Sequence, residues 1–362
     1  GEFKNGDVAI LDGQEGIVIK NPGADMIREY KIKKEKYDSF KRELKEMRGR
    51  ETVTTDGFRV ELAANIGTPG DMDAVLENDS EGIGLFRTEF LYMGRNRLPT
   101  EDEQFEAYKE VALKMEGKPV VIRTLDIGGD KAVPYLEMRR EMNPFLGCRA
   151  IRLCLDRPEI FKTQLRAILR AAVFGNIKLM FPMISCIEEL RQARCVLEEV
   201  KADLRKEAIA FRADMEVGVM IEVPAAAVMS DLLAKEADFF SIGTNDLLQY
   251  LTAVDRGNQE ISRLYCQFHP ALLRMIKQII DNGHAAGIRV GMCGEAAGDP
   301  KLIPLLVGMG LDEFSMNPAS IFRARRIISG TSHKEMGKIV DRAINLSTAE
   351  EVEKLIEENI TE

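Results

Sequence analysis

Short apolar runs recur along the chain from about Val60, and most are followed by a segment with helical periodicity. The alternation of strand-like and helix-like segments predicts a parallel sheet whose strands are connected by helices. Eight such units within roughly 250 residues predict an α/β fold, a closed (β/α)8 barrel of the TIM type, with a doubly wound open sheet as the alternative. The predicted strands lie in VELAANIG, GIGLFRTEF, PVVIRTLDIGG, IKLMFPMI, EVGVMIEVPAA, FFSIGTNDL, RVGMCGEAAG and LDEFSMNPAS.

The beginning of the chain follows a different pattern. Residues 4–22 alternate apolar and polar side chains around an Asp-Gly pair, which is typical of a β-hairpin. A hairpin is marginally stable by itself. We therefore expect residues 1–25 to be the remnant of a domain whose body lies outside this sequence.

Residues 26–55 are highly charged and carry one line of apolar side chains at helical spacing. These side chains belong to Tyr37, Phe40, Leu44 and Met47. The pattern favours a linker helix, with a partner-binding coiled coil as the alternative. The barrel is then assigned to residues 56–362.

Several predicted strands end in polar or charged side chains, which a buried strand alone does not explain. In FFSIGTNDLLQY, the apolar strand stops at Gly243 and is followed by Asn245 and Asp246. In barrels of this type, the chemistry takes place where the strands end and the following loops begin. The candidate site residues at such positions are Arg87, Arg123, Glu222, Asn245, Asp246 and Cys293, with Arg256 in the loop after Asp246.

Glu222 and Asp246 lie on neighbouring predicted strands and suit Mg²⁺, because this ion prefers one or two carboxylates plus water and substrate oxygens. The alternative is that both carboxylates pair with arginines and bind no metal. The candidate arginines offer planar forks for carboxylate or phosphate oxygens, and Asn245 can donate its amide to phosphate without adding charge. The site is therefore predicted to bind a small anion together with magnesium.

Cys293 lies close to two glycines at a predicted strand end, where a thiol can meet a bound substrate. An inert, packed core thiol is the alternative. The histidines His269, His284 and His333 lie away from the predicted strand ends, and we interpret them as structural or surface residues. The predicted site therefore contains no histidine that accepts a phosphoryl group.

Net charge, hydropathy and cysteine content exclude several classes of protein. The formal net charge of −9 favours neither a nucleic-acid partner nor an acidic membrane surface. The sequence contains no apolar run of transmembrane length and no signal-peptide pattern, so no membrane insertion is expected. The six cysteines form no CxxC pair and no zinc-ligand spacing, which predicts free thiols in a cytoplasmic protein.

Six motifs occur in a characteristic order: GIGLFRTEFLYM, IRTLDIGGDK, NPFLGCRAIR, GVMIEVPAA, DFFSIGTNDLLQYLTAVDRGN and MCGEAAGD. In sequence and order they resemble the C-terminal phosphoenolpyruvate-binding domain of enzyme I of the bacterial phosphoenolpyruvate:sugar phosphotransferase system. The resemblance covers nearly the whole chain.

The resemblance implies that five residues bind phosphoenolpyruvate: Arg87, Arg123, Asn245, Asp246 and Arg256. It further implies that Glu222 and Asp246 ligate Mg²⁺, and that Arg149 in NPFLGCRAIR is a further active-site arginine. Cys293 matches the cysteine that protonates the enolpyruvate carbon, which yields pyruvate.

In this family the phosphoryl acceptor is a histidine of an N-terminal domain, within a GGxTSH-type signature that this sequence does not contain. We therefore expect a C-terminal part of such a protein, whose phosphoryl group passes to a histidine of a missing N-terminal domain. That phosphohistidine domain then charges a small phosphocarrier protein. The family also implies a homodimer.

Two alternative functions remain open from the sequence. One is the phosphoenolpyruvate domain of a pyruvate phosphate dikinase or phosphoenolpyruvate synthase relative, which would need an ATP-grasp domain. The other is a phosphoenolpyruvate-sensing module that binds this ligand without transferring its phosphoryl group. Pyruvate release in the presence of a histidine-bearing domain separates catalysis from sensing.

Overall fold

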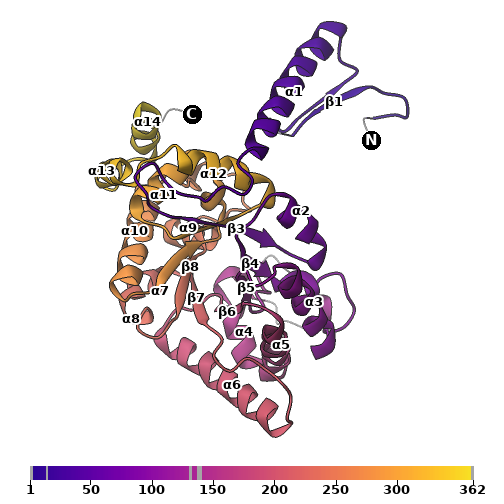
Figure 1. Ribbon diagram of the computed structural model, residues 1–362, viewed down its shortest axis with the longest axis vertical. Coiled ribbons are helices and arrows are strands. Elements are labelled where there is room, and N and C mark those ends of the chain that lie inside the picture. The colour runs from indigo at the N-terminus through magenta and orange to yellow at the C-terminus, as the bar shows by residue number, and fades with distance from the viewer. Residues whose placement is uncertain (1–2, 14, 130–132, 137–140, 360–362) are drawn as a thin grey trace. The chain divides into compact units, whose positions relative to one another are not determined.

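The computed structural model describes residues 3–13, 15–129, 133–136 and 141–359 (Figure 1). The chain divides into two compact units, Gly1–Gly49 and Arg50–Glu362. Within the described part of the chain, no helix combines the length and the apolar character needed to cross a membrane.

The N-terminal unit contains a hairpin and a helix, as the sequence pattern predicts. Strand β1 (Ala9–Asp12) pairs antiparallel with β2 (Ile17–Lys20), and helix α1 (Ala24–Lys45) follows. The Lys33 ammonium on α1 lies 2.6 Å from the Asp12 carboxylate, which ties the helix to the hairpin. The interpretation of residues 1–25 as a domain remnant stays a prediction.

The second unit is built on a closed barrel of eight parallel strands, in the order β10-β3-β4-β5-β6-β7-β8-β9. Each predicted apolar run forms one of these strands, so the predicted (β/α)8 barrel is confirmed. The strands are β3 (Glu61–Ile66), β4 (Gly82–Arg87), β5 (Val120–Arg123), β6 (Ile177–Phe181), β7 (Val217–Ile221), β8 (Phe239–Ile242), β9 (Arg289–Met292) and β10 (Glu313–Met316).

Helices surround the barrel and connect its strands (Figure 1). Thr100 and Glu103 begin α3 with a capping box, and proline at the first turn begins α5 and α10. The helices of this unit are α2 (Met72–Glu77), α3 (Glu101–Lys114), α4 (Ile151–Asp156), α5 (Pro158–Ala171), α6 (Ile187–Lys206), α7 (Pro224–Val228), α8 (Ser230–Leu233), α9 (Thr244–Thr252), α10 (Pro270–Ala285), α11 (Ile303–Met309), α12 (Ile321–Ser329), α13 (His333–Ala343) and α14 (Ala349–Asn359).

The core has two layers, because alternate residues of a strand face opposite sides of the sheet. On β5, Val120 and Ile122 belong to the large cluster between strands and helices, whereas Val121 belongs to a small separate cluster. The small cluster consists of Leu85, Val121, Met180, Met220, Phe239 and Cys293. These side chains lie in the barrel interior, below the carboxyl ends of the strands.

Candidate active site

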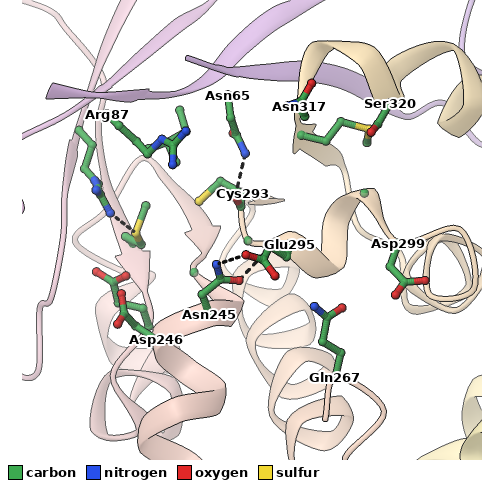
Figure 2. A pocket seen from close by; sticks show the side chains of 18 of the residues that line it. Asn65, Arg87, Asn245, Asp246, Gln267, Cys293, Glu295, Asp299, Asn317 and Ser320 are labelled. Carbon is green, nitrogen blue, oxygen red and sulfur yellow. Dashed lines mark hydrogen bonds between the residues drawn. The ribbon is translucent and has the colours of Figure 1, made fainter. Parts of the chain in front are cut away.

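A cavity of about 550 Å³ lies at the carboxyl ends of the strands (Figure 2). Its lining includes seven of the eight residues singled out from the sequence: Arg87, Arg123, Glu222, Asn245, Asp246, Arg256 and Cys293. These residues are far apart in the sequence, and the barrel brings them together because parallel strands present their carboxyl ends at one face.

Arg123, the last residue of β5, is held in place by two carboxylates. One of its terminal nitrogens donates to both Glu89 oxygens at 2.9 and 3.1 Å, and the other lies 3.0 Å from Asp126. All three side chains are buried. The guanidinium is therefore fixed in one orientation before any ligand arrives, which reduces the entropy lost on binding.

Arg149 lies behind the cavity and is not part of its lining. Its guanidinium is 2.9 Å from Asp126 and 3.4 Å from Asp246, and it donates to the Tyr250 hydroxyl at 3.1 Å. Arg149 is almost completely buried. In this structure its charge acts on the cavity through the two aspartates that it positions.

Glu222 and Asp246 both line the cavity and both are buried. Glu222 follows β7 and accepts a hydrogen bond from the Met183 backbone N–H at 2.7 Å. Burial, together with the negative charges of Asp246 and Asp126, raises the pKa of Glu222 to about 8, although the Arg123 and Arg149 charges oppose the rise. A buried carboxylate with other carboxylates beside it is a favourable place for a cation.

Asn245 and Glu295 form a reciprocal pair at the rim of the cavity (Figure 2). The Asn245 amide donates to the Glu295 carboxylate at 3.3 Å, and its oxygen accepts the Glu295 backbone N–H at 3.0 Å. Arg256 lies beyond the end of α9, where its backbone N–H donates to Gln249 at 3.1 Å. Asn245 and Arg256 therefore both come from the segment that follows β8.

Cys293 follows β9 and its thiol faces the barrel interior below the cavity. The backbone N–H of Cys293 donates to Ile242 at 3.1 Å, and its carbonyl accepts the Asn65 amide at 3.0 Å (Figure 2). Burial raises the pKa of the thiol to about 12, although the Ser241 hydroxyl and the Arg123 charge act in the opposite direction. The thiol is therefore protonated at neutral pH and can act as an acid.

The charges that line the cavity do not balance. Among the lining residues that the structure describes, three arginines face five carboxylates, namely Arg87, Arg123 and Arg256 against Asp126, Glu222, Asp246, Glu295 and Asp299. Among the described residues, no group of three or more His, Cys, Asp or Glu side chains is arranged to hold a metal ion alone. Mg²⁺ needs fewer protein ligands than that, because water and substrate oxygens complete its shell.

Sequence reasoning missed several residues of this cavity. Asn65 is the next-to-last residue of β3, and a polar side chain so near the end of a predicted strand was a signal that could have marked it. Gln267 and Asp299 come from loops, where no periodic pattern marks a residue as part of a site. Within the described residues, the Gln267 side-chain oxygen is buried without a hydrogen-bond partner.

Comparisons with known proteins identify a family for this chain. Residues 41–333 match the family model described as PEP-utilising enzyme, PEP-binding domain. The chain is also similar to proteins named phosphoenolpyruvate-protein phosphotransferase from Staphylococcus carnosus (56% identical), Staphylococcus epidermidis (54%) and Geobacillus stearothermophilus (56%). These alignments cover 99%, 98% and 97% of this chain, but 62%, 62% and 61% of the relatives' own length.

Proposed function

The chain belongs to the family of PEP-utilising enzymes, through their PEP-binding domain, and from this premise we propose that it binds phosphoenolpyruvate with Mg²⁺ and donates its phosphoryl group to a histidine of another domain. The family assignment confirms the resemblance found in the motifs. The proposed reaction releases pyruvate and is the first step of the sugar phosphotransferase system, in which the phosphohistidine then charges a small phosphocarrier protein in the cytoplasm.

The observation that carries this proposal is the arrangement of arginines and carboxylates around one cavity at the strand ends. Arg87, Arg123 and Arg256 suit the carboxylate and phosphate of phosphoenolpyruvate, because guanidinium groups bind such oxygens in pairs. Arg149 supports the site from behind through Asp126 and Asp246. Asn245 adds an amide donor for phosphate without adding charge.

Magnesium fits the residues that are present. An anionic substrate binds more favourably in a lining with more carboxylates than arginines when a cation accompanies it. Glu222 and Asp246 would hold the ion. When bound, Mg²⁺ would neutralise phosphate charge as it develops during transfer.

The chain's own residues suggest how the reaction is completed. The arginines orient the phosphoryl group for in-line transfer, and positioned positive charge lowers the barrier because negative charge spreads over the phosphoryl oxygens. The leaving group is an enolate. The protonated thiol of Cys293 then delivers a proton to the enolate carbon, which forms pyruvate.

The acceptor histidine is proposed to lie outside this chain, because its three histidines are all engaged elsewhere. His269 caps α10, His284 lies 2.9 Å from Asp312, and the His333 ring nitrogen lies 2.7 Å from the Val307 carbonyl. None of the three lines the cavity.

The proposed function is tested by calorimetric titration of the chain with phosphoenolpyruvate, with and without Mg²⁺. We expect magnesium-dependent binding that Arg256→Ala weakens by about 2 kcal/mol, because a charge-assisted hydrogen bond is lost. Arg263→Ala is the matched control, since Arg263 lies in the same loop but outside the cavity lining. Absence of binding, or equal binding by both variants, would contradict the proposal.

We also propose that the chain forms a homodimer through the loops that follow β4 and β5. Tyr135 of one loop donates a hydrogen bond to the Tyr92 carbonyl of the other at 2.5 Å, so the loops are adjacent. Their described residues include five large apolar side chains that are exposed: Phe90, Met93, Leu98, Met142 and Leu146. Contiguous exposed apolar groups are typical of a protein interface.

Sedimentation measurements should give a dimer at micromolar concentration, and Met142→Asp with Leu146→Asp should shift it to monomer. Both subunits of a symmetric dimer contribute the same surface to the interface. The introduced carboxylates of both subunits would therefore be buried there without partners. Leu113→Asp on α3 is the control, because Leu113 is also exposed and apolar but lies outside these loops. A monomeric unmodified chain would rule out the proposed dimer.

A further inference from the structure

A second polar cavity lies inside the barrel at the opposite, amino-terminal end of the strands. Its volume is about 30 Å³, which is enough for a water molecule. Its polar lining consists of Glu61, Lys178, Ser241, Arg289 and Glu313. Arg289 and Glu61 form an ion pair at 2.8 Å, and the Arg289 side chain is 58% exposed, so the cavity borders the protein surface.

Strand register places three of the cavity residues in one row inside the barrel. Ser241 on β8 pairs with Gly291 on β9, and Gly291 pairs with Glu313 on β10. Paired residues of parallel strands face the same side of the sheet, so the Ser241 and Glu313 side chains flank Gly291. A side-chain carbon on Gly291 would lie 3.3 Å from a Glu313 carboxylate oxygen. The glycine therefore keeps open the gap between the hydroxyl and the carboxyl group.

Ser241 also lies next to the thiol of the active site. Cys293 is two residues beyond Gly291 and therefore faces the same interior. The Ser241 hydroxyl acts to lower the pKa of the Cys293 thiol, so the two groups are neighbours, although they form no hydrogen bond in this structure. Ser241 is buried and its hydroxyl has no other partner within the described residues.

Glu313 can both accept and release a proton near neutral pH. Burial and the neighbouring Glu61 carboxylate raise the pKa of Glu313 to about 7, while Arg289 and Lys178 oppose this rise and Asp312 adds to it. The group is partly exposed at the end of the barrel and reaches inward along Gly291. Glu313 therefore lies between the amino-terminal end of the barrel and the interior row.

We propose that Glu313, the cavity beside Gly291 and Ser241 form a proton path from the amino-terminal end of the barrel to the Cys293 thiol. The proposal rests on the proposed function, in which Cys293 loses a proton in every turnover. In the proposed reaction the substrate occupies the cavity at the other end of the barrel, so a separate route from the amino-terminal end would restore the acid form of the thiol.

Each turnover consumes one proton along this path. Cys293 gives its proton to the enolate carbon, where a C–H bond forms, and the thiol becomes a thiolate. The thiolate takes a proton from the Ser241 hydroxyl. In the same concerted shift, Ser241 takes a proton from Glu313 through a water molecule that the cavity would hold. The Glu313 carboxylate then takes a proton from solvent, which returns all three groups to their starting state.

The path is tested by following hydrogen–deuterium exchange of the Cys293 thiol in the full chain with phosphoenolpyruvate and Mg²⁺ bound. The infrared S–H stretching band lies apart from other protein bands, and a difference spectrum against Cys293→Ser isolates this thiol from the other five cysteines. We expect Glu313→Gln and Ser241→Ala to slow the exchange at least about 100-fold, the lower end of the range for loss of a proton-transfer group.

Two further variants sharpen the test. Gly291→Ala keeps both proton-carrying groups but fills the gap between them, and it should slow exchange as well. Glu110→Gln, an exposed glutamate on α3, is the matched control and should exchange at the unmodified rate. Unmodified rates in all three path variants, with ligand binding intact by calorimetry, would overturn the proton path alone. Absence of phosphoenolpyruvate binding would instead overturn the proposed function on which it rests.

Discussion

Glu222→Gln is expected to abolish the gain in phosphoenolpyruvate affinity that Mg²⁺ provides, lowering affinity in magnesium by at least about 100-fold. The substitution keeps the size of the side chain and an oxygen that accepts the Met183 N–H, but it removes the charge that would hold the ion. Calorimetric titrations at pH 9 measure this effect, because the metal-free Glu222, whose pKa burial raises to about 8, is then ionised.

The same variant should behave differently without metal. Removing one negative charge from a lining with an excess of carboxylates should leave phosphoenolpyruvate binding unchanged or slightly tighter. Glu295→Gln is the matched control, because it removes an equal charge from the same cavity but should keep the magnesium-dependent gain. An equal loss in both variants would show that Glu222 contributes only general electrostatics and is not a metal ligand.

Cys293→Ser is expected to reduce pyruvate formation about 100-fold or more while leaving phosphoenolpyruvate binding nearly unchanged. The hydroxyl fits the space of the thiol but is a far weaker acid. The measurement needs a histidine-bearing domain added in trans, and turnover will be slow because tethering is absent. The chain alone should bind phosphoenolpyruvate without releasing pyruvate.

Cys154→Ser provides a close control for this experiment. Cys154 is a second buried thiol whose pKa burial also raises, and its sulfur lies 3.9 Å from a backbone carbonyl, as does that of Cys293. It lies on α4, outside the cavity. Unimpaired turnover in Cys293→Ser would show that Cys293 is an inert core thiol. Rapid pyruvate release by the chain alone would show that the phosphoryl acceptor lies within this chain.

Much of the barrel was predictable because each strand carries its own local signal. An apolar run that ends in charged residues indicates both a strand and the end of the barrel at which its last residues lie. For this reason Arg123 and Asp246 could be predicted as site residues. The position of Arg149 behind Asp126 was not predictable, because it depends on how the long segment between β5 and β6 folds. The row of Ser241, Gly291 and Glu313 depends on the register of three strands, which no single run encodes.

The excess of carboxylates over arginines in the cavity has a thermodynamic consequence. Two ligands of opposite charge that bind together raise each other's affinity by the same factor, so phosphoenolpyruvate would retain Mg²⁺ as strongly as Mg²⁺ retains phosphoenolpyruvate. Pyruvate carries less negative charge than phosphoenolpyruvate. Loss of the phosphoryl group would therefore loosen the ion, and each new cycle would respond to the concentration of free magnesium.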